Sequence, residues 1–185
     1  TITYAQFDQA ADRFAAALYS LGVRQRDRVA IMLPNVLQQP IAYFGTLRAG
    51  AIVVNTNPTY TVRELHHQLV DSGAETIITL TGTYNRVQEA RPDTRIKRVI
   101  TTDLVDALPF YWKFLATSKI RASGLMADVP DAPDRYDFYK LIKSNPANPP
   151  AITYAPDDVV LFQYTGGTTG IPKAAMLTNH NLMSN

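Results

Sequence analysis

The spacing of apolar residues along the first half of the chain switches between the period of a helix and that of a buried strand. Between Phe7 and Leu21 apolar side chains recur three or four residues apart, which predicts an amphipathic helix that ends at Gly22. Residues 28–33 form a short apolar run stopped by Pro34, as is typical of a strand buried in a parallel sheet. The chain is therefore predicted to open with a helix and an inner strand.

The same alternation continues after this strand. A helical pattern over residues 36–49 ends at Gly50 and is followed by a strand-like run at 51–54. Thr61 and Glu64 have the spacing of a capping box, in which a hydroxyl and a carboxylate bind the free N–H groups at the start of a helix. A second βα pair is therefore expected here.

Two more strands are predicted at residues 76–80 and 98–101, each rich in β-branched residues. Strands that alternate with helices build βαβ units, in which the strands run parallel and the helices cover the sheet. The predicted fold class is therefore α/β, a mostly parallel sheet with flanking helices.

The second half of the chain is less regular. Five prolines, at positions 130, 133, 146, 149 and 150, lie in residues 128–156, which are predicted to be a connector with one short helix at 139–144. We therefore divide the chain into an α/β subdomain at 1–127, this connector, and a strand, a loop and the start of a helix at 157–185. Because the chain has no initial Met and stops where a helix begins, it is interpreted as a fragment of a longer protein.

Composition excludes several classes of protein. The 185 residues are 46% hydrophobic and 18% charged, as in a globular domain, and the net charge of +2 without a basic run argues against a nucleic-acid partner. The chain has no cysteine, so disulfides and thiolate metal sites are excluded and a reducing, cytoplasmic location is expected. No apolar stretch approaches the roughly 20 residues of a membrane-spanning helix.

The strongest chemical signal follows a predicted strand at 159–164. Three glycines in five positions allow a tight turn whose N–H groups form an anion nest, while three threonine hydroxyls and one lysine add donors and positive charge. Such a loop suits the phosphate chain of a nucleotide. The candidate ligand-binding residues are Thr165, Gly166, Gly167, Thr168, Thr169, Gly170 and Lys173.

The loop is not a Walker-type P-loop. That motif has its lysine directly after the last glycine and a Ser or Thr after the lysine to hold magnesium. Here Ile171 and Pro172 separate Gly170 from Lys173, and Ala174 follows. A flexible Gly/Thr-rich turn without a ligand is the alternative interpretation of the residues alone.

Residues 164–173 resemble the phosphate-loop signature of the adenylate-forming superfamily, which includes acyl-CoA synthetases, firefly luciferase and peptide synthetase adenylation domains. The similarity extends over the whole chain, with further landmarks at residues 3–4, 22–35, 47–51 and 57–58. The resemblance implies the incomplete N-terminal part of the synthetase fold. It also implies that the loop holds the β- and γ-phosphates of ATP while a carboxylate attacks the α-phosphorus.

Residues 52–69 are most similar to bacterial long-chain fatty acid–CoA ligases, and Gly166 replaces the serine found in many other members. This resemblance implies that fatty acid, ATP and CoA give acyl-CoA, AMP and pyrophosphate through an acyl-adenylate, with Mg²⁺. The acyl pocket, the adenine site and a C-terminal lysine would lie beyond Asn185, so the fragment is expected to be inactive alone. We assign no catalytic residue and no metal ligand within it.

Two positions depart from the superfamily pattern. Ala174 stands where glycine is usual, and Asn179 takes the place of the usual histidine, so no role is transferred to His180. Two other functions stay open: an adenylate-forming ligase for an aryl, acetyl or amino acid, and a truncated binding module without catalysis. The neighbours His66 and His67 diverge on a helix and are interpreted as structural.

The stretch 108–121 combines aromatic and basic residues. Phe110, Trp112 and Phe114 lie close to Lys119 and Arg121, a composition that suits an interfacial helix on an anionic membrane. Peripheral contact with the inner face of the membrane through this stretch is one expectation. The other is a helix that covers the sheet and leaves its basic residues in solvent.

Overall fold

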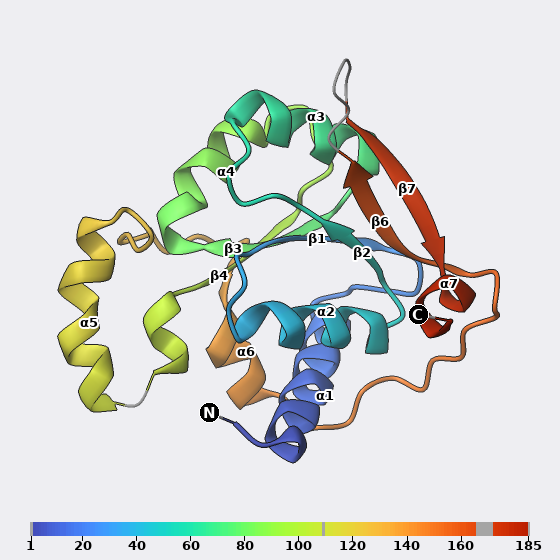
Figure 1. The fold of residues 1–185 in the computed structure, drawn as a ribbon, viewed down its shortest axis with the longest axis horizontal. Helices are drawn as coiled ribbons and strands as arrows, with labels where there is room; N and C mark the ends of the chain where they lie inside the picture. The colour runs from blue at the N-terminus through green and yellow to red at the C-terminus, as the bar shows by residue number, and fades with distance from the viewer. Residues whose placement is uncertain (1, 109, 166–171, 185) are drawn as a thin grey trace.

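A computed structural model describes residues 2–108, 110–165 and 172–184, the side chains of 110–115 excepted. Its centre is a sheet whose strand order is β5-β4-β3-β1-β2-β6-β7 (Figure 1). Neighbouring strands are parallel except for β7, which runs antiparallel to β6. The predicted α/β class with a mostly parallel sheet is confirmed. The strands are β1 (Arg28–Met32), β2 (Ile52–Asn55), β3 (Thr76–Leu80), β4 (Arg98–Thr102), β5 (Arg135–Asp137), β6 (Val159–Thr165) and β7 (Lys173–Thr178).

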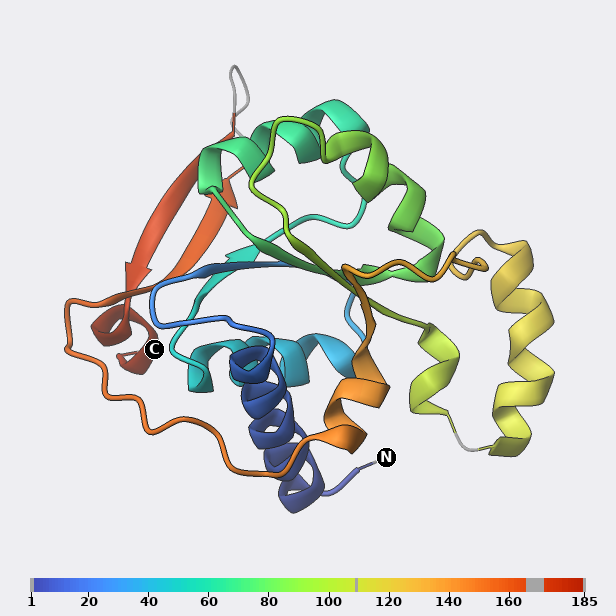
Figure 2. The same ribbon diagram turned by 180° about the vertical axis from the view of Figure 1, so that it is seen from behind.

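Helices cover the sheet in two layers. Helices α1, α2 and α6 pack on one face and α3 and α4 on the other (Figures 1 and 2). The helix α5 lies beyond the edge of the sheet, beside the short 3₁₀ helix η2 (Leu104–Ala107). The helices are α1 (Tyr4–Ser20), α2 (Gln38–Arg48), α3 (Val62–Ser72), α4 (Tyr84–Ala90), α5 (Phe110–Ala122), α6 (Phe138–Ser144) and α7 (Asn179–Met183), with a second 3₁₀ helix, η1 (Thr81–Thr83).

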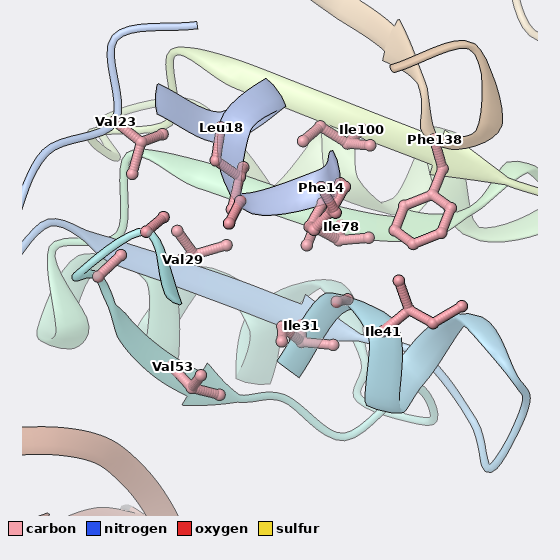
Figure 3. Close-up of a cluster of buried hydrophobic side chains, with 14 of the residues drawn as sticks. Phe14, Leu18, Val23, Val29, Ile31, Ile41, Val53, Ile78, Ile100 and Phe138 are labelled. Atoms are coloured by element: carbon pink, nitrogen blue, oxygen red, sulfur yellow. The ribbon is translucent and has the colours of Figure 1, made fainter. Parts of the chain in front are cut away.

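The two-residue period of a strand explains which side chains enter each half of the core, because successive side chains point to opposite faces of the sheet. In β1, Val29 and Ile31 point to the face with α1 and α2, whereas Ala30 and Met32 point to the face with α3 and α4. Both sets are buried, which explains why an inner strand appears in the sequence as an unbroken apolar run. Figure 3 shows the first cluster, in which Phe14 of α1 lies against Phe138 of α6 with ring centroids 4.6 Å apart.

Helix α3 has well-defined ends. The hydroxyl of Thr61 accepts from the N–H of Glu64, and the Glu64 carboxylate accepts from the N–H of Thr61, which confirms the predicted capping box. At the other end Gly73 adopts a left-handed conformation, with φ of 61°. The helix is therefore fixed at both ends, which matters for the site described below.

Residues 128–156 are more than a linker in the structure. They contain the expected short helix, α6, and also β5, which pairs with β4 and was not predicted. Phe138 of α6 is fully buried in the core. The sheet thus includes strands from all three predicted parts of the chain, and the division at 127 and 157 stays a prediction.

Most of the aromatic-basic stretch 108–121 lies in helix α5, but the structure does not show what this stretch does. The aromatic side chains at 110–112 and 114 lie outside the described residues. In the described part of α5, Arg121 forms an ion pair with Asp128, and none of residues 116–122 belongs to either core cluster. None of the described helices is long and apolar enough to cross a membrane. Membrane contact through 108–121 stays a prediction.

Candidate functional site

A polar pocket of about 520 Å³ lies where β1, β2 and β6 end. These strands are parallel, so their carboxyl ends meet at one edge of the sheet. After β1 the chain enters α2 on one face, and after β2 it enters α3 on the other, so the connections diverge at this point. A crevice at such a topological switch point is where open α/β sheets bind ligands. The pocket is lined by Leu33, Pro34, Asn35, Asn55, Thr56, Asn57, Pro58, Tyr60, Gln163 and Tyr164.

Amide groups organise this pocket. Asn55, at the end of β2, donates from Nδ2 to Oε1 of Gln163 on β6, at 2.9 Å. Gln68 of α3 is buried and donates from Nε2 to the backbone carbonyl of Asn55, also at 2.9 Å. The ends of β2 and β6 are thus linked to each other and to α3. Sequence reasoning did not select these three residues, since an isolated Asn or Gln carries no motif.

The predicted phosphate-binding segment connects β6 to β7. Of its residues, Gly166, Gly167, Thr168, Thr169 and Gly170 lie outside the described part of the chain. The two flanking residues, Thr165 and Lys173, are cross-strand partners in the antiparallel β6–β7 pair. The structure therefore brings the first and last of the predicted ligand-binding residues together at the mouth of the loop.

Lys173 lies beside a second pocket of about 520 Å³, between α3 and the β6–β7 pair. Both Lys173 and Thr165 are exposed, and no described ion pair involves Lys173. An exposed ammonium group without a carboxylate partner, next to a glycine-rich turn, suits an anionic ligand. The pocket is lined by His67, Asp71, Phe162, Tyr164, Pro172, Lys173, Ala174 and Met176.

Tyr164 forms the wall between the two pockets. Its ring is only 7% exposed and packs in the core cluster under α3. Its hydroxyl donates to Oδ2 of Asp71, in the last turn of α3, at 2.5 Å. Burial, followed by this hydrogen bond, raises the pKa of the Tyr164 hydroxyl above its ordinary value. A tyrosine hydroxyl is already protonated near neutral pH at its ordinary pKa of about 10, so this hydroxyl acts as a donor.

The two histidines of α3 differ in their surroundings. His66 bonds through Nδ1 to the backbone carbonyl of Ala90 at 2.9 Å, a structural contact between α3 and α4. His67 instead lines the pocket beside Lys173, although the sequence suggested a structural role for both. Within the described residues no group of three or more His, Cys, Asp or Glu side chains is arranged to hold a metal ion.

Comparison with known proteins shows the family to which this chain belongs. A model of the family described as AMP-binding enzyme matches residues 1–185. The long-chain-fatty-acid–CoA ligase of Escherichia coli O157:H7 is 38% identical over 193 residues, which cover 100% of this chain and 33% of that protein. The ligase of the same name from Bacillus subtilis (strain 168) is 37% identical over 175 residues, covering 94% of this chain and 31% of that one. The 4-coumarate-CoA ligase 1 of Narcissus pseudonarcissus is 32% identical, covering 100% and 29%.

Solved structures share the fold. A long-chain-fatty-acid-CoA ligase (FadD1) from Archaeoglobus fulgidus superposes with a TM-score of 0.76 at 24% identity, covering 99% of this chain and 31% of that one. ATP-bound MatB from Rhodopseudomonas palustris gives a TM-score of 0.77 at 23% identity, with 99% and 31% covered. The chain spans about a third of the length of the curated relatives it matches. With its whole length matched by the family model and its sheet shared with these enzymes, the chain belongs to the AMP-binding, adenylate-forming enzyme family.

Proposed function

We propose that this chain is the phosphate-loop part of an ATP-dependent long-chain fatty acid–CoA ligase. The observation that carries the proposal is the 38% identity, over the whole chain, to bacterial proteins of that name. The reaction would join a fatty acid to CoA through an acyl-adenylate, with release of pyrophosphate and AMP. Because the chain spans about a third of such relatives, the proposal concerns the full-length protein, and the fragment alone is expected to be inactive.

The site supports binding of the ATP phosphates. Thr165 and Lys173 meet across β6 and β7 at the mouth of the loop. In our proposal they act with Gly166, Gly167, Thr168, Thr169 and Gly170. The Lys173 ammonium group supplies positive charge, and the hydroxyls and loop N–H groups donate to phosphate oxygens. In such sites preorganised donors would stabilise the negative charge that develops on the pyrophosphate leaving group.

This chain contains less of the sites for the other reactants, which are Mg²⁺, the fatty acid and CoA. Mg²⁺ would enter together with ATP. Among the described residues, no group of three or more His, Cys, Asp or Glu side chains is arranged to hold it. The fatty acid and CoA are substrates whose pockets depend on sequence beyond this chain. A cytoplasmic location is part of the same proposal, since ATP and CoA are used there.

The test is ATP–pyrophosphate exchange by the full-length protein from the same gene, with carboxylic acids of increasing chain length. We expect exchange to be fastest with long-chain acids. Lys173→Ala should slow it by about 100-fold, the usual cost of removing a donor to developing charge. Lys143→Ala, which removes an exposed lysine of α6, is the matched control and should leave the rate unchanged.

A second candidate substrate class is supported by one observation, the 32% identity to a 4-coumarate-CoA ligase. Aryl acids therefore belong in the same panel. Fastest exchange with an aryl acid would keep the adenylate-forming reaction and overturn the fatty acid assignment. Folded full-length protein without exchange for any acid would contradict the ligase proposal and favour a binding module.

A further inference from the structure

Helix α3 contacts the loop-bearing strand through one of its faces. Gln68 and Asp71 are three positions apart, so their side chains project from the same side of the helix. Gln68 bonds to the end of β2, and Asp71 accepts from the Tyr164 hydroxyl at the end of β6. Both contacts are made at the carboxyl ends of the strands, directly before the pocket and the loop begin.

The position of Asp71 does not favour the helix itself. It lies in the last turn of α3, where the partial negative charge of the helix C-terminus repels a carboxylate. No described ion pair compensates this charge, and the carboxylate accepts a hydrogen bond from the Tyr164 hydroxyl. A carboxylate that is unfavourable for its own helix but contacts the residue before the loop suggests a role in the loop.

The register of β6 explains why such a contact is useful. The β6–β7 pairing is irregular between Val159 and Leu161, near the start of β6. A shift of one residue in a strand turns every side chain to the opposite face. At the other end of β6, Thr165 and Lys173 must stay opposite each other for both to reach the same ligand. The hydrogen bond from Tyr164 to Asp71 opposes such a shift, together with the pairing of β6 with β2.

From these contacts we infer that the Tyr164–Asp71 hydrogen bond positions Thr165 and Lys173, the two described residues of the predicted phosphate-binding segment, so that α3 sets the affinity of the site for nucleotide phosphates. Tyr164 and Asp71 are thus positioning residues that act through Thr165 and Lys173. This inference rests on the proposed function, because it assigns to the bond an effect on ATP. It extends that proposal to a helix outside the loop motif.

The test uses the full-length protein and separates KM for ATP from kcat in the exchange assay. Tyr164→Phe and Asp71→Ala should each raise KM for ATP about tenfold, the scale of one hydrogen bond to a charged group, with kcat within about twofold. Asp71→Asn should lie between Asp71→Ala and the unmodified protein, because an amide oxygen still accepts a hydrogen bond. The double variant Tyr164→Phe/Asp71→Ala should be no worse than either single one.

Tyr154→Phe is the matched control. The Tyr154 hydroxyl also donates a bond of 2.5 Å, to the backbone carbonyl of Leu47, but at the connector, away from the loop. Its loss should lower stability without changing KM for ATP. Equal KM values for Tyr164→Phe, Tyr154→Phe and the unmodified protein would overturn the inference. Asp71 is exposed, so its variants decide the question if Tyr164→Phe does not fold.

A second measurement does not depend on the ligase proposal. Amide hydrogen exchange of residues 159–165 and 172–178 should become faster in Tyr164→Phe and Asp71→Ala and stay unchanged in Tyr154→Phe. If the full-length protein adenylates no acid, the proposed function fails while amide exchange still tests the positioning role. Unchanged amide exchange in both variants would contradict that role even in an active enzyme.

Discussion

The centre and the C-terminal edge of the same sheet are built in opposite ways. Every residue of β3 is buried, whereas no residue of β7 is buried and Met176 is 64% exposed. The centre has helices on both faces and a parallel neighbour on each side, so burial of apolar area determines its sequence. At the C-terminal edge, hydrogen bonds between particular side chains hold strand β6, which ends at the residues proposed to bind the ATP phosphates. In our proposal, stability and function are thus assigned to different strands of one sheet.

The largest expected effect is on the free energy of unfolding, and it tests the buried centre of the molecule. Phe14 is fully buried against Phe138, and Phe14→Ala should lower the free energy of unfolding by about 3–5 kcal/mol through lost burial and the cavity left behind. Urea unfolding of the full-length protein measures it. Met176→Ala on the exposed edge strand is the control, with an expected change within about 0.5 kcal/mol. Similar losses for the two variants would remove the contrast between centre and edge.

A substitution in the capping box of α3 tests how far this helix, which joins both regions, contributes to stability and to the order of β6. Thr61→Ala removes the hydroxyl that accepts from the N–H of Glu64 and should destabilise the protein by about 1 kcal/mol. Thr61→Ser keeps an acceptor and should recover most of this loss. If α3 positions the loop as inferred, amide exchange in residues 159–165 should also rise in Thr61→Ala. A stability loss with no change there would mean that the first turn of α3 is not coupled to β6.

The smallest expected effect lies at the amino ends of β3 and β4, whereas the pocket lies at the carboxyl ends of β1, β2 and β6. The Lys97 ammonium group donates to the Glu75 carboxylate at 2.9 Å, and this hydrogen bond lowers the pKa of Glu75 below its ordinary value. A carboxyl whose pKa is lowered by folding stabilises the protein above its ordinary pKa, and the contribution is lost as pH falls through the lowered value.

Lys97→Met should therefore raise the Glu75 pKa towards normal and reduce the pH dependence of stability in the acid range by less than about 1 kcal/mol. NMR titration of Glu75 and urea unfolding at two pH values measure both effects. Lys143→Met is the control for the loss of one positive charge. Because Lys97 lies at the amino end of β4, away from the pocket at the carboxyl ends, KM for ATP should not change. A change would contradict the separation of the two regions.

The sequence was sufficient where one local pattern determined the structure. Inner strands, the capping box of α3 and the helix start at Asn179 were predicted because apolar runs and capping residues act over a few positions. Strand β5 was missed because its three residues have no apolar alternation and owe their conformation to pairing with β4. Strand β7 was missed because its pairing with β6 depends on the returning loop.

The candidate site could be predicted only in part for a related reason. The loop has a motif, so Thr165 and Lys173 were selected as candidates, and the structure brings them together. Their role in ligand binding stays a prediction. Asp71 and Tyr164 are 93 positions apart, and no local pattern joins an aspartate at a helix end to a tyrosine in a distant strand. Asn55 and Gln163, 108 positions apart, were missed for the same reason.

The pairing of β2 with β6 also has a consequence for synthesis of the protein. Asn55 leaves the ribosome well before Gln163, its partner 108 positions later. At a synthesis rate of about 5–20 residues per second, about 5–20 seconds pass between the synthesis of β2 and that of β6. The outer edge of β2 stays without its partner strand for that time. During that time an apolar strand, Ile52–Asn55, has unpaired backbone groups and can pair with another nascent chain. Because β2 and β6 are neighbours in the sheet but far apart in the sequence, the protein is at risk of aggregation while it is being synthesised.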